Sequence, residues 1–265
     1  SFVYSRSSNE VSKLLTNPTI QDMVGYNSQS ATSQGGFAKE GYPLKSLFSV
    51  PFNGLNSSGL PTFTNQQGDA TINGIRFDSQ DVDFLKYSGT LIPTDKGSLS
   101  NTINYKGISL GVVLTYSYGN VVRLRGMRNI YNDYSTVPRE LNNRWQYAGD
   151  ENKTDIPVLY TTYMYQRLFN GWKEMNQAYL TYDYSDVRIA KGDNIRLKEI
   201  SLGYTFDKNF LRESRIRQLS LKLQATNIAL LYADKKLNGD DPDYLANGYA
   251  PIPPKRLIFT LRVGL

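Results

Sequence analysis

A strict alternation of apolar and polar side chains runs from residue 108 to residue 118. The apolar positions are Ile108, Leu110, Val112, Leu114, Tyr116 and Tyr118, and Ser109, Gly111, Thr115 and Ser117 fall between them, with Val113 as the exception. Successive side chains of a β-strand point to opposite faces. This period of two therefore predicts one long strand with an apolar face and a face of small polar groups.

Four further segments carry the same pattern. Their apolar positions are Leu99, Ile103 and Tyr105; Ile200, Leu202, Tyr204 and Phe206; Leu219, Leu221, Leu223 and Ala225; and Leu257, Phe259, Leu261, Val263 and Leu265. Lys106 and Gly107 separate the first two strands, and a two-residue connection that ends in Gly predicts a tight hairpin. The phase of the 200–206 segment does not extend back through Leu197 and Ile195, which predicts a bulge or strand entry near Lys198.

Alternation of this kind fits two all-β architectures, because an apolar strand face can meet a second sheet in a soluble sandwich or lipid in a membrane barrel. Three features favour the barrel. The polar faces are rich in small and amide side chains, and strands of about ten residues match the tilted span of a bilayer. Aromatic residues, which populate membrane interfaces, recur near strand ends at Tyr105, Tyr116, Tyr118, Tyr204, Phe206 and Phe259. The predicted fold is a set of antiparallel transmembrane β-barrel strands.

The connections between these strands differ greatly in length. Lys106 and Gly107 form a minimal turn and residues 207–218 a modest connection, whereas residues 120–194 form a very long one. Short turns on one rim and long loops on the other are the outer-membrane pattern. We therefore expect residues 120–194 to be a long outward loop.

The composition removes several classes of function. The 265 residues include neither Cys nor His, which removes thiolate and imidazole metal sites, cysteine nucleophiles and histidine bases. Nothing holds two of the 24 acidic residues at the separation that glycoside hydrolysis requires. We expect no enzymatic activity and no cofactor.

The net charge of +6 would allow a nucleic-acid partner if the basic residues clustered on one face. The densest basic run, residues 212–217, lies between two predicted strands and contains Glu213. We interpret it as a solvated turn and expect no nucleic-acid partner. The mean hydropathy of −0.45 resembles that of a soluble protein, but the alternation of a barrel strand cancels in such an average.

Several segments, in order along the chain, resemble the SusC/RagA family of outer-membrane receptors. Residues 88–120 read SGTLIPTDKGSLSNTINYKGISLGVVLTYSYGN, and residues 142–157 read NNRWQYAGDENKTDIP. Residues 194–206 read NIRLKEISLGYTF, and residues 221–231 read LKLQATNIALL. The closing segment is NGDDPDYLANGYAPIPPKRLIFTLRVGL, and an upstream stretch is FNGLNSSGLPTFTNQQGD. The resemblance covers most of the chain.

This resemblance implies a TonB-dependent receptor of the bacterial outer membrane with a barrel of about twenty-two strands. Residues 1–265 would be the C-terminal part of that barrel, contributing about seven or eight strands, without the N-terminal plug domain and the TonB-contact segment. It also implies a SusD-like surface lipoprotein over the barrel mouth and import of glycans or oligopeptides. Because unpaired sheet edges are untenable in lipid, we expect a preceding barrel and plug segment to complete the barrel.

Two alternatives remain open. A small self-contained outer-membrane barrel requires its first and last strands to pair, which would bring Val3 close to Leu261. A soluble carbohydrate-binding β-sandwich requires a second sheet over the apolar face.

The long connection is dense in aromatic residues that could contact substrate or a partner protein. The candidates are Trp145, Tyr147, Tyr163, Tyr165, Trp172 and Tyr182. Such rings stack on sugars, anchor protein interfaces, or build the core of the loop itself.

An acidic cluster, Asp240, Asp241 and Asp243, permits a second interpretation besides a turn. Carboxylate oxygens are ligands for calcium, but the spacing is not that of an EF-hand loop. Pro242 within the cluster favours a turn.

Overall fold

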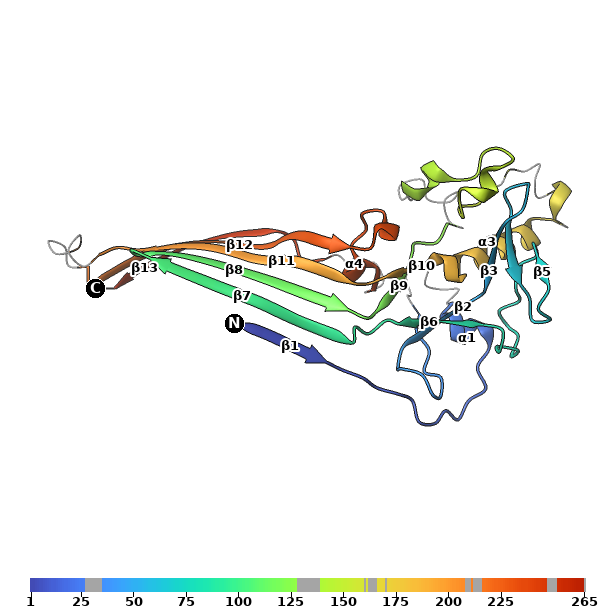
Figure 1. Ribbon diagram of the computed structural model, residues 1–265, viewed down its shortest axis with the longest axis horizontal. Coiled ribbons are helices and arrows are strands. Elements are labelled where there is room, and N and C mark those ends of the chain that lie inside the picture. The colour runs from blue at the N-terminus through green and yellow to red at the C-terminus, as the bar shows by residue number, and fades with distance from the viewer. Residues whose placement is uncertain are drawn as a thin grey trace.

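A six-stranded antiparallel sheet extends away from a compact region in the computed structural model (Figure 1). The structure describes residues 1–26, 35–127, 139–159, 161, 166–169, 171–207, 211, 216–246 and 252–264. The strand order in the sheet is β1-β7-β8-β11-β12-β13. The strands are β1 (Phe2–Arg6), β7 (Asp95–Tyr105), β8 (Ile108–Tyr118), β11 (Asn194–Thr205), β12 (Gln218–Ala233) and β13 (Arg256–Gly264). The all-β prediction is thereby confirmed.

The β7–β8 hairpin is confirmed in detail. Tyr105 pairs with Ile108, so the turn consists of Lys106 and Gly107 alone. Their φ angles are 45° and 83°. Positive φ at both central residues is what a tight hairpin turn with the right-handed strand twist requires, and Gly adopts it without a steric penalty.

The bulge expected near Lys198 is also confirmed. The register of β11 shifts between Leu197 and Glu199 against both of its neighbours, β8 and β12. The extra residue explains why the apolar phase of residues 200–206 does not continue toward the start of the strand.

Among the described residues, the extended sheet has six strands. Residues 46–90 and the ends of the 120–194 segment form short strands in separate small sheets. These are β2 (Ser46–Ser49) with β6 (Lys86–Thr90); β3 (Phe52–Leu55), β4 (Pro61–Thr64) and β5 (Ala70–Thr71); and β9 (Val121–Arg123) with β10 (Ile189–Lys191).

Helical segments complete the compact region. They are α1 (Ile20–Val24), η3 (Arg139–Asn143), η4 (Asp150–Asn152), α3 (Trp172–Asp183), η5 (Asp186–Arg188), η6 (Lys235–Leu237) and α4 (Pro242–Ala246). A capping box between Thr19 and Asp22 starts α1, and Gly25 ends it in the left-handed conformation. The described part of residues 120–194 therefore contains regular elements, of which α3 is the longest helix.

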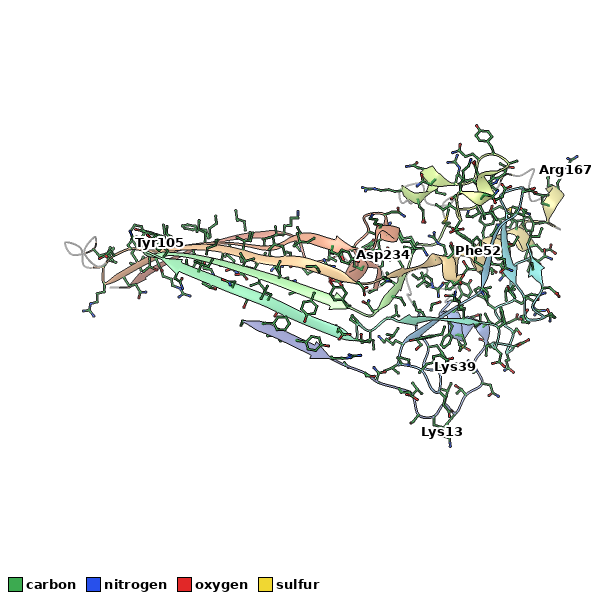
Figure 2. The ribbon with its side chains drawn as sticks, viewed as in Figure 1. Lys13, Lys39, Phe52, Tyr105, Arg167 and Asp234 are labelled. Atoms are coloured by element: carbon green, nitrogen blue, oxygen red, sulfur yellow. The ribbon has the colours of Figure 1, made fainter. Side chains whose placement is uncertain are left out.

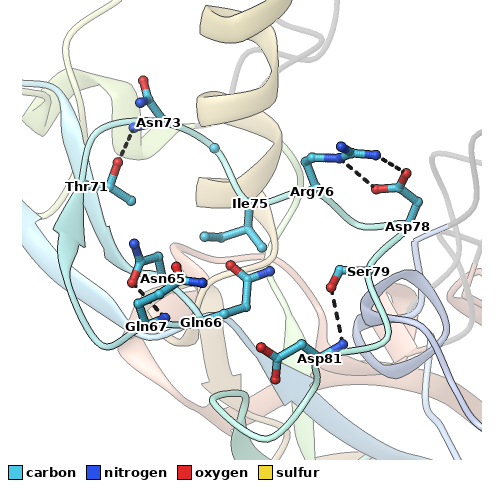
Figure 3. Close-up of a pocket in the computed structure, with 11 residues that line it drawn as sticks. Asn65, Gln66, Gln67, Thr71, Asn73, Ile75, Arg76, Asp78, Ser79 and Asp81 are labelled. Atoms are coloured by element: carbon cyan, nitrogen blue, oxygen red, sulfur yellow. Dashed lines mark hydrogen bonds and ion pairs between the residues drawn. The ribbon is translucent and has the colours of Figure 1, made fainter.

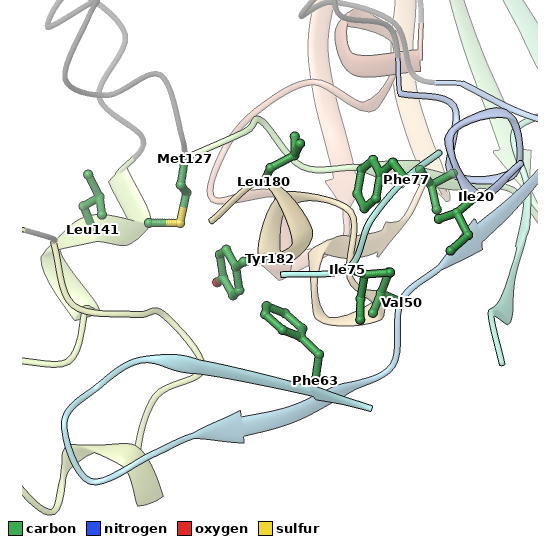
Figure 4. Close-up of a cluster of buried hydrophobic side chains, with 10 residues drawn as sticks. Ile20, Val50, Phe63, Ile75, Phe77, Met127, Leu141, Leu180 and Tyr182 are labelled. Atoms are coloured by element: carbon green, nitrogen blue, oxygen red, sulfur yellow. The ribbon is translucent and has the colours of Figure 1, made fainter. Parts of the chain in front are cut away.

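The hydrophobic core lies in the compact region and not in the sheet. Its largest cluster joins distant parts of the chain, as Figure 4 shows. It contains Ile20, Val24, Val50, Phe63, Ile75, Phe77, Met127, Leu141, Leu180 and Tyr182. Residues from before β7 and from between β8 and β11 thus share one core, so the two connections fold as one unit.

Candidate functional site

One face of the six-stranded sheet is apolar from edge to edge. The cross-strand pairs form rows on this face, of which one is Ile103, Leu110, Leu202, Leu223 and Phe259. These side chains are largely exposed, at 62% for Ile103 and 66% for Phe259. No described element covers the face, which leaves an extensive apolar surface without a partner. Soluble monomers seldom expose contiguous apolar patches beyond a few hundred Å².

Aromatic rings gather at both ends of this face. At the end nearest the compact region lie Phe2, Tyr4, Tyr116, Tyr118 and Tyr232, which the register brings to neighbouring rows. At the opposite end, Tyr105 lies beside the β7–β8 turn (Figure 2). There the rings of Tyr204 and Phe206 meet edge to face with centroids 4.8 Å apart.

The opposite face of the sheet is polar. One of its rows is Thr102, Gly111, Ser201 and Gln224, ending in Ile258 on β13, and a second is Asn104, Ser109, Gly203, Lys222 and Thr260. A Cβ at Gly203 would lie 2.4 Å from Ser109 Oγ and one at Gly111 would lie 2.7 Å from Ser201 Oγ, so a side chain at either position would require the serine hydroxyl to rotate away. The sheet therefore has one apolar face and one largely polar face.

Within the described part of the chain, the sheet is open at both edges. Among the described strands, β1 pairs only with β7, and β13 pairs only with β12. The first and last strands lie at opposite edges, so Val3 and Leu261 do not meet as a self-contained barrel requires. A sandwich would need a second sheet over the apolar face, and none of the described strands provides one.

Three of the predicted contact residues lie at or near the surface of the compact region. Tyr147 is 75% exposed and Trp172, the first residue of α3, is 52% exposed. Trp145 is partly buried, and its indole Nε1 donates a 2.9 Å hydrogen bond to Glu151 Oε2. That bond lowers the pKa of the Glu151 carboxyl below its usual value. Gly59 packs against the Trp145 ring so closely that a Cβ would lie 2.4 Å from Cδ2.

Tyr182 lies in the core, with only 1% of its surface exposed, so its ring has no free face for a ligand. It packs edge to face on Phe52, with centroids 5.8 Å apart, and burial raises its pKa. The spacing of aromatic residues in sequence could not indicate this, because burial depends on what folds over α3. Tyr163 and Tyr165 lie outside the described residues, as does most of the basic run at 212–217.

A buried ion pair holds the connection between β8 and β11 together. The Arg188 guanidinium donates to both carboxylate oxygens of Glu140, at 2.9 and 2.6 Å, and to the Arg125 carbonyl at 2.6 Å. The two side chains are 2% and 9% exposed. Burial alone would lower the pKa of Arg188, but the Tyr182 and Glu140 groups raise it, so the guanidinium stays charged. Sequence reasoning missed this pair, since 48 residues separate its members.

The acidic cluster binds arginines. Arg196 Nη1 donates to Asp241 Oδ2 at 2.7 Å, and Nη2 lies 2.9 Å from Asp243 Oδ2. Asp240 Oδ2 lies 3.4 Å from Arg125 Nε. Within the described residues no group of three or more acidic side chains is placed to hold a metal ion. The cluster instead docks the loop between β12 and β13 onto the start of β11.

A polar hollow of about 570 Å³ opens on the compact region. Figure 3 shows Asn65, Gln66 and Gln67 on one side of it, Ser79 and Asp81 on another, and Ile75 between them. Arg76 binds Asp78 there with a 2.6 Å contact. Amide side chains offer both hydrogen-bond donors and acceptors, so the lining of this hollow can form hydrogen bonds of both kinds.

None of the described helices combines the length and apolar content needed to cross a membrane.

Comparison of the sequence with protein-family models and with curated proteins gives no match. The fold is nevertheless similar to part of a solved transporter. The RagAB peptide importer in its open-open state superposes with a TM-score of 0.57 at 18% identity, over 86% of this chain and 23% of that chain. The RagAB peptide transporter gives 0.54 at 18% identity, over 84% and 23%.

The closed-closed state of the same importer gives 0.52 at 17% identity, over 84% of this chain and 23% of that chain. At these identities the common property is the fold. The chain shares a β fold with part of the RagAB chains and spans about a quarter of their length.

Proposed function

We propose that the chain is a wall segment of a TonB-dependent β-barrel importer in a bacterial outer membrane. The observation that carries this proposal is the open six-stranded sheet with one uncovered apolar face between two groups of aromatic rings. Such a face requires an apolar solvent, and lipid is the solvent that aromatic interfacial groups border. The similarity to RagAB supports the same assignment.

The dimensions of the apolar face suit a bilayer. Tyr118 lies ten residue steps beyond Ile108 in β8, which is about 33 Å along a strand at about 3.3 Å per residue. A strand tilted by about 40° then covers about 25 Å of depth, the height of the apolar band in outer-membrane barrels.

The two ends of the sheet face different sides in this proposal. The two-residue β7–β8 turn lies at the end remote from the compact region. Short turns belong to the periplasmic rim and long connections to the outer surface. The compact region, including the exposed Tyr147 and Trp172, then faces outward, where a SusD-like lipoprotein would close over the barrel.

The open edges of β1 and β13 support the proposal that further strands of the receptor pair with this sheet. A strand edge in lipid leaves backbone N–H and C=O groups without partners, at several kcal/mol each. The remaining barrel strands, to a total of about twenty-two, would pair with both edges. The plug and the TonB contact would belong to that remaining part, and the substrate would be a glycan or an oligopeptide bound on the polar face and the outward loops.

Single-cysteine labelling of the complete receptor tests the membrane assignment. Leu202→Cys lies on the apolar face and Ser201→Cys on the polar face, and this chain has no cysteine of its own. In native membranes, a lipid-soluble maleimide should label position 202 and a charged maleimide should label position 201. Equal labelling of both positions by the charged reagent would refute a lipid-facing sheet.

A further inference from the structure

The ladder between β11 and β12 has two register shifts, and at the second one both strands bulge. Leu197 pairs with Ala229 and Glu199 pairs with Thr226, so Lys198 on one strand, and residues 227 and 228 on the other, have no ladder partner. Asn227 adopts a left-handed φ of 54°. Bulges bend a strand, re-aim its side chains and recur beside binding sites.

A hollow of about 610 Å³ lies at this interruption. The bulge residues of both strands form one side, and the loop that carries Asp241 and Asp243 forms another. The segment before β13 forms a third side and is held in place because Asn227 Nδ2 donates to the Pro254 carbonyl at 3.2 Å. The bulge thus positions both a strand surface and a loop around one cavity.

The charges around this hollow do not balance. Three cations, Arg196, Lys198 and Lys255, line it together with the carboxylates of Asp241 and Asp243. Arg196 binds both carboxylates. Within the described part of the chain, neither Lys198 nor Lys255 has a carboxylate within ion-pair distance. The lining therefore carries one net positive charge, with two ammonium groups available to an anion.

The rest of the lining is largely apolar. Leu197, Ile228, Ile252 and Pro253 contribute to it. A ligand that matches both parts has an anionic group with an apolar group beside it. A neutral glycan lacks the anion, whereas the C-terminal residue of an oligopeptide has a carboxylate next to a side chain.

We propose that this hollow binds the C-terminal carboxylate of an oligopeptide through Lys198 and Lys255, with the last side chain against Ile228 and Ile252. Charge-assisted hydrogen bonds from ammonium groups to a carboxylate are about twice as strong as neutral ones. Arg196 shares the polar face of the sheet with Thr115 and Ser98. The inference rests on the proposed function in that this face would be the lumen of the barrel.

The test compares two forms of one peptide on the complete receptor in detergent. The probes are Ala-Leu-Val with an N-terminal fluorophore, once with a free carboxylate and once as the C-terminal amide, and binding is read from fluorescence anisotropy. We expect the acid to bind about tenfold more tightly than the amide, because only the acid accepts charge-assisted hydrogen bonds. The double variant Lys198→Gln/Lys255→Gln should bind both forms equally.

Lys222→Gln is the matched control, because Lys222 lies on the same polar face but away from the hollow, where it pairs with Gly203 and Thr260. This variant should keep the preference for the acid. Equal affinity for acid and amide, a preference that survives the double substitution, or failure of both peptides to bind overturns the inference.

Labelling at positions 201 and 202 separates this outcome from a failure of the proposed function. If the labelling alternates and the acid has no advantage, only the carboxylate site is wrong. If the acid is preferred but the labelling does not alternate, the membrane assignment is wrong and the carboxylate site stands.

Discussion

Replacing Ile200 with arginine should destabilise the membrane-inserted receptor strongly if the apolar face meets lipid. Ile200 pairs with Val112, which lies four residues from Ile108 and six from Tyr118. These separations correspond to about 13 and 20 Å along the strand, so Ile200 lies near the middle of the apolar band. An arginine at the bilayer midplane of a barrel costs about 2–4 kcal/mol.

Position along the strand provides the first control. Ile108 lies at the turn end of the same face, where Tyr105 and Tyr204 are its partners. Ile108→Arg removes the same side chain and adds the same charge, but near an interface such a charge costs only about 0–1 kcal/mol. Both variants lose an isoleucine, so the difference between their free energies of unfolding reports only the depth of the charge in the membrane.

The opposite face provides the second control. Gln224 pairs with Ser201 on the polar face, so Gln224→Arg should change the free energy of unfolding little. Guanidinium unfolding of the complete receptor in lipid vesicles, followed by heat-modifiable mobility on gels, measures all three variants. Equal losses at positions 200 and 108, or a loss at position 224 as large as that at position 200, would refute the reasoning.

Three further predictions concern the compact region. Glu140→Gln leaves the buried Arg188 charge without its anion and should destabilise this region by about 3–5 kcal/mol. The loss should be seen as faster hydrogen exchange in α3. Asp78→Asn, which removes one partner of an exposed ion pair, should leave hydrogen exchange unchanged. Gly59→Ala introduces a Cβ against the Trp145 ring at φ 73° and should lower the free energy of unfolding by about 1–3 kcal/mol. Gly68→Ala is the control and should have a smaller effect, because its φ is also positive but the space around it is open. Similar shifts in melting temperature for both variants would contradict the packing argument. Burial raises the pKa of the Asp241 carboxyl, but the hydrogen bonds and charge of Arg196 outweigh this effect and lower the pKa below its usual 3.8. Their stabilisation is therefore complete above the pKa of the unfolded state and is lost as the pH falls through the pKa of the folded state. Hydrogen exchange around Leu237 and Leu245 should rise only below about pH 4, and a rise already near pH 6 would contradict this.

The sequence predicted those features that depend on the local period of side chains. The alternation at 108–118 is β8 residue for residue, and the Lys106–Gly107 turn and the bulge at Lys198 lie where the pattern places them. These features follow from sequence because each depends on neighbours within a few residues.

Tertiary structure decided the rest, because it brings together residues far apart in the chain. The two connections that flank the β7–β8 hairpin fold into one core, which buries Tyr182 and leaves Tyr147 at the surface. Arg188 pairs with Glu140, 48 residues away in sequence, and Arg196 pairs with Asp241, 45 residues away. No local pattern marks such partners.

The open edges of the sheet show most clearly which features the sequence determines and which depend on tertiary structure. Alternation in sequence determined that each strand has an apolar and a polar face, since that follows from the geometry of a single strand. Only the paired sheet decided that the first and last strands lie at opposite edges, because pairing depends on which strands meet in space.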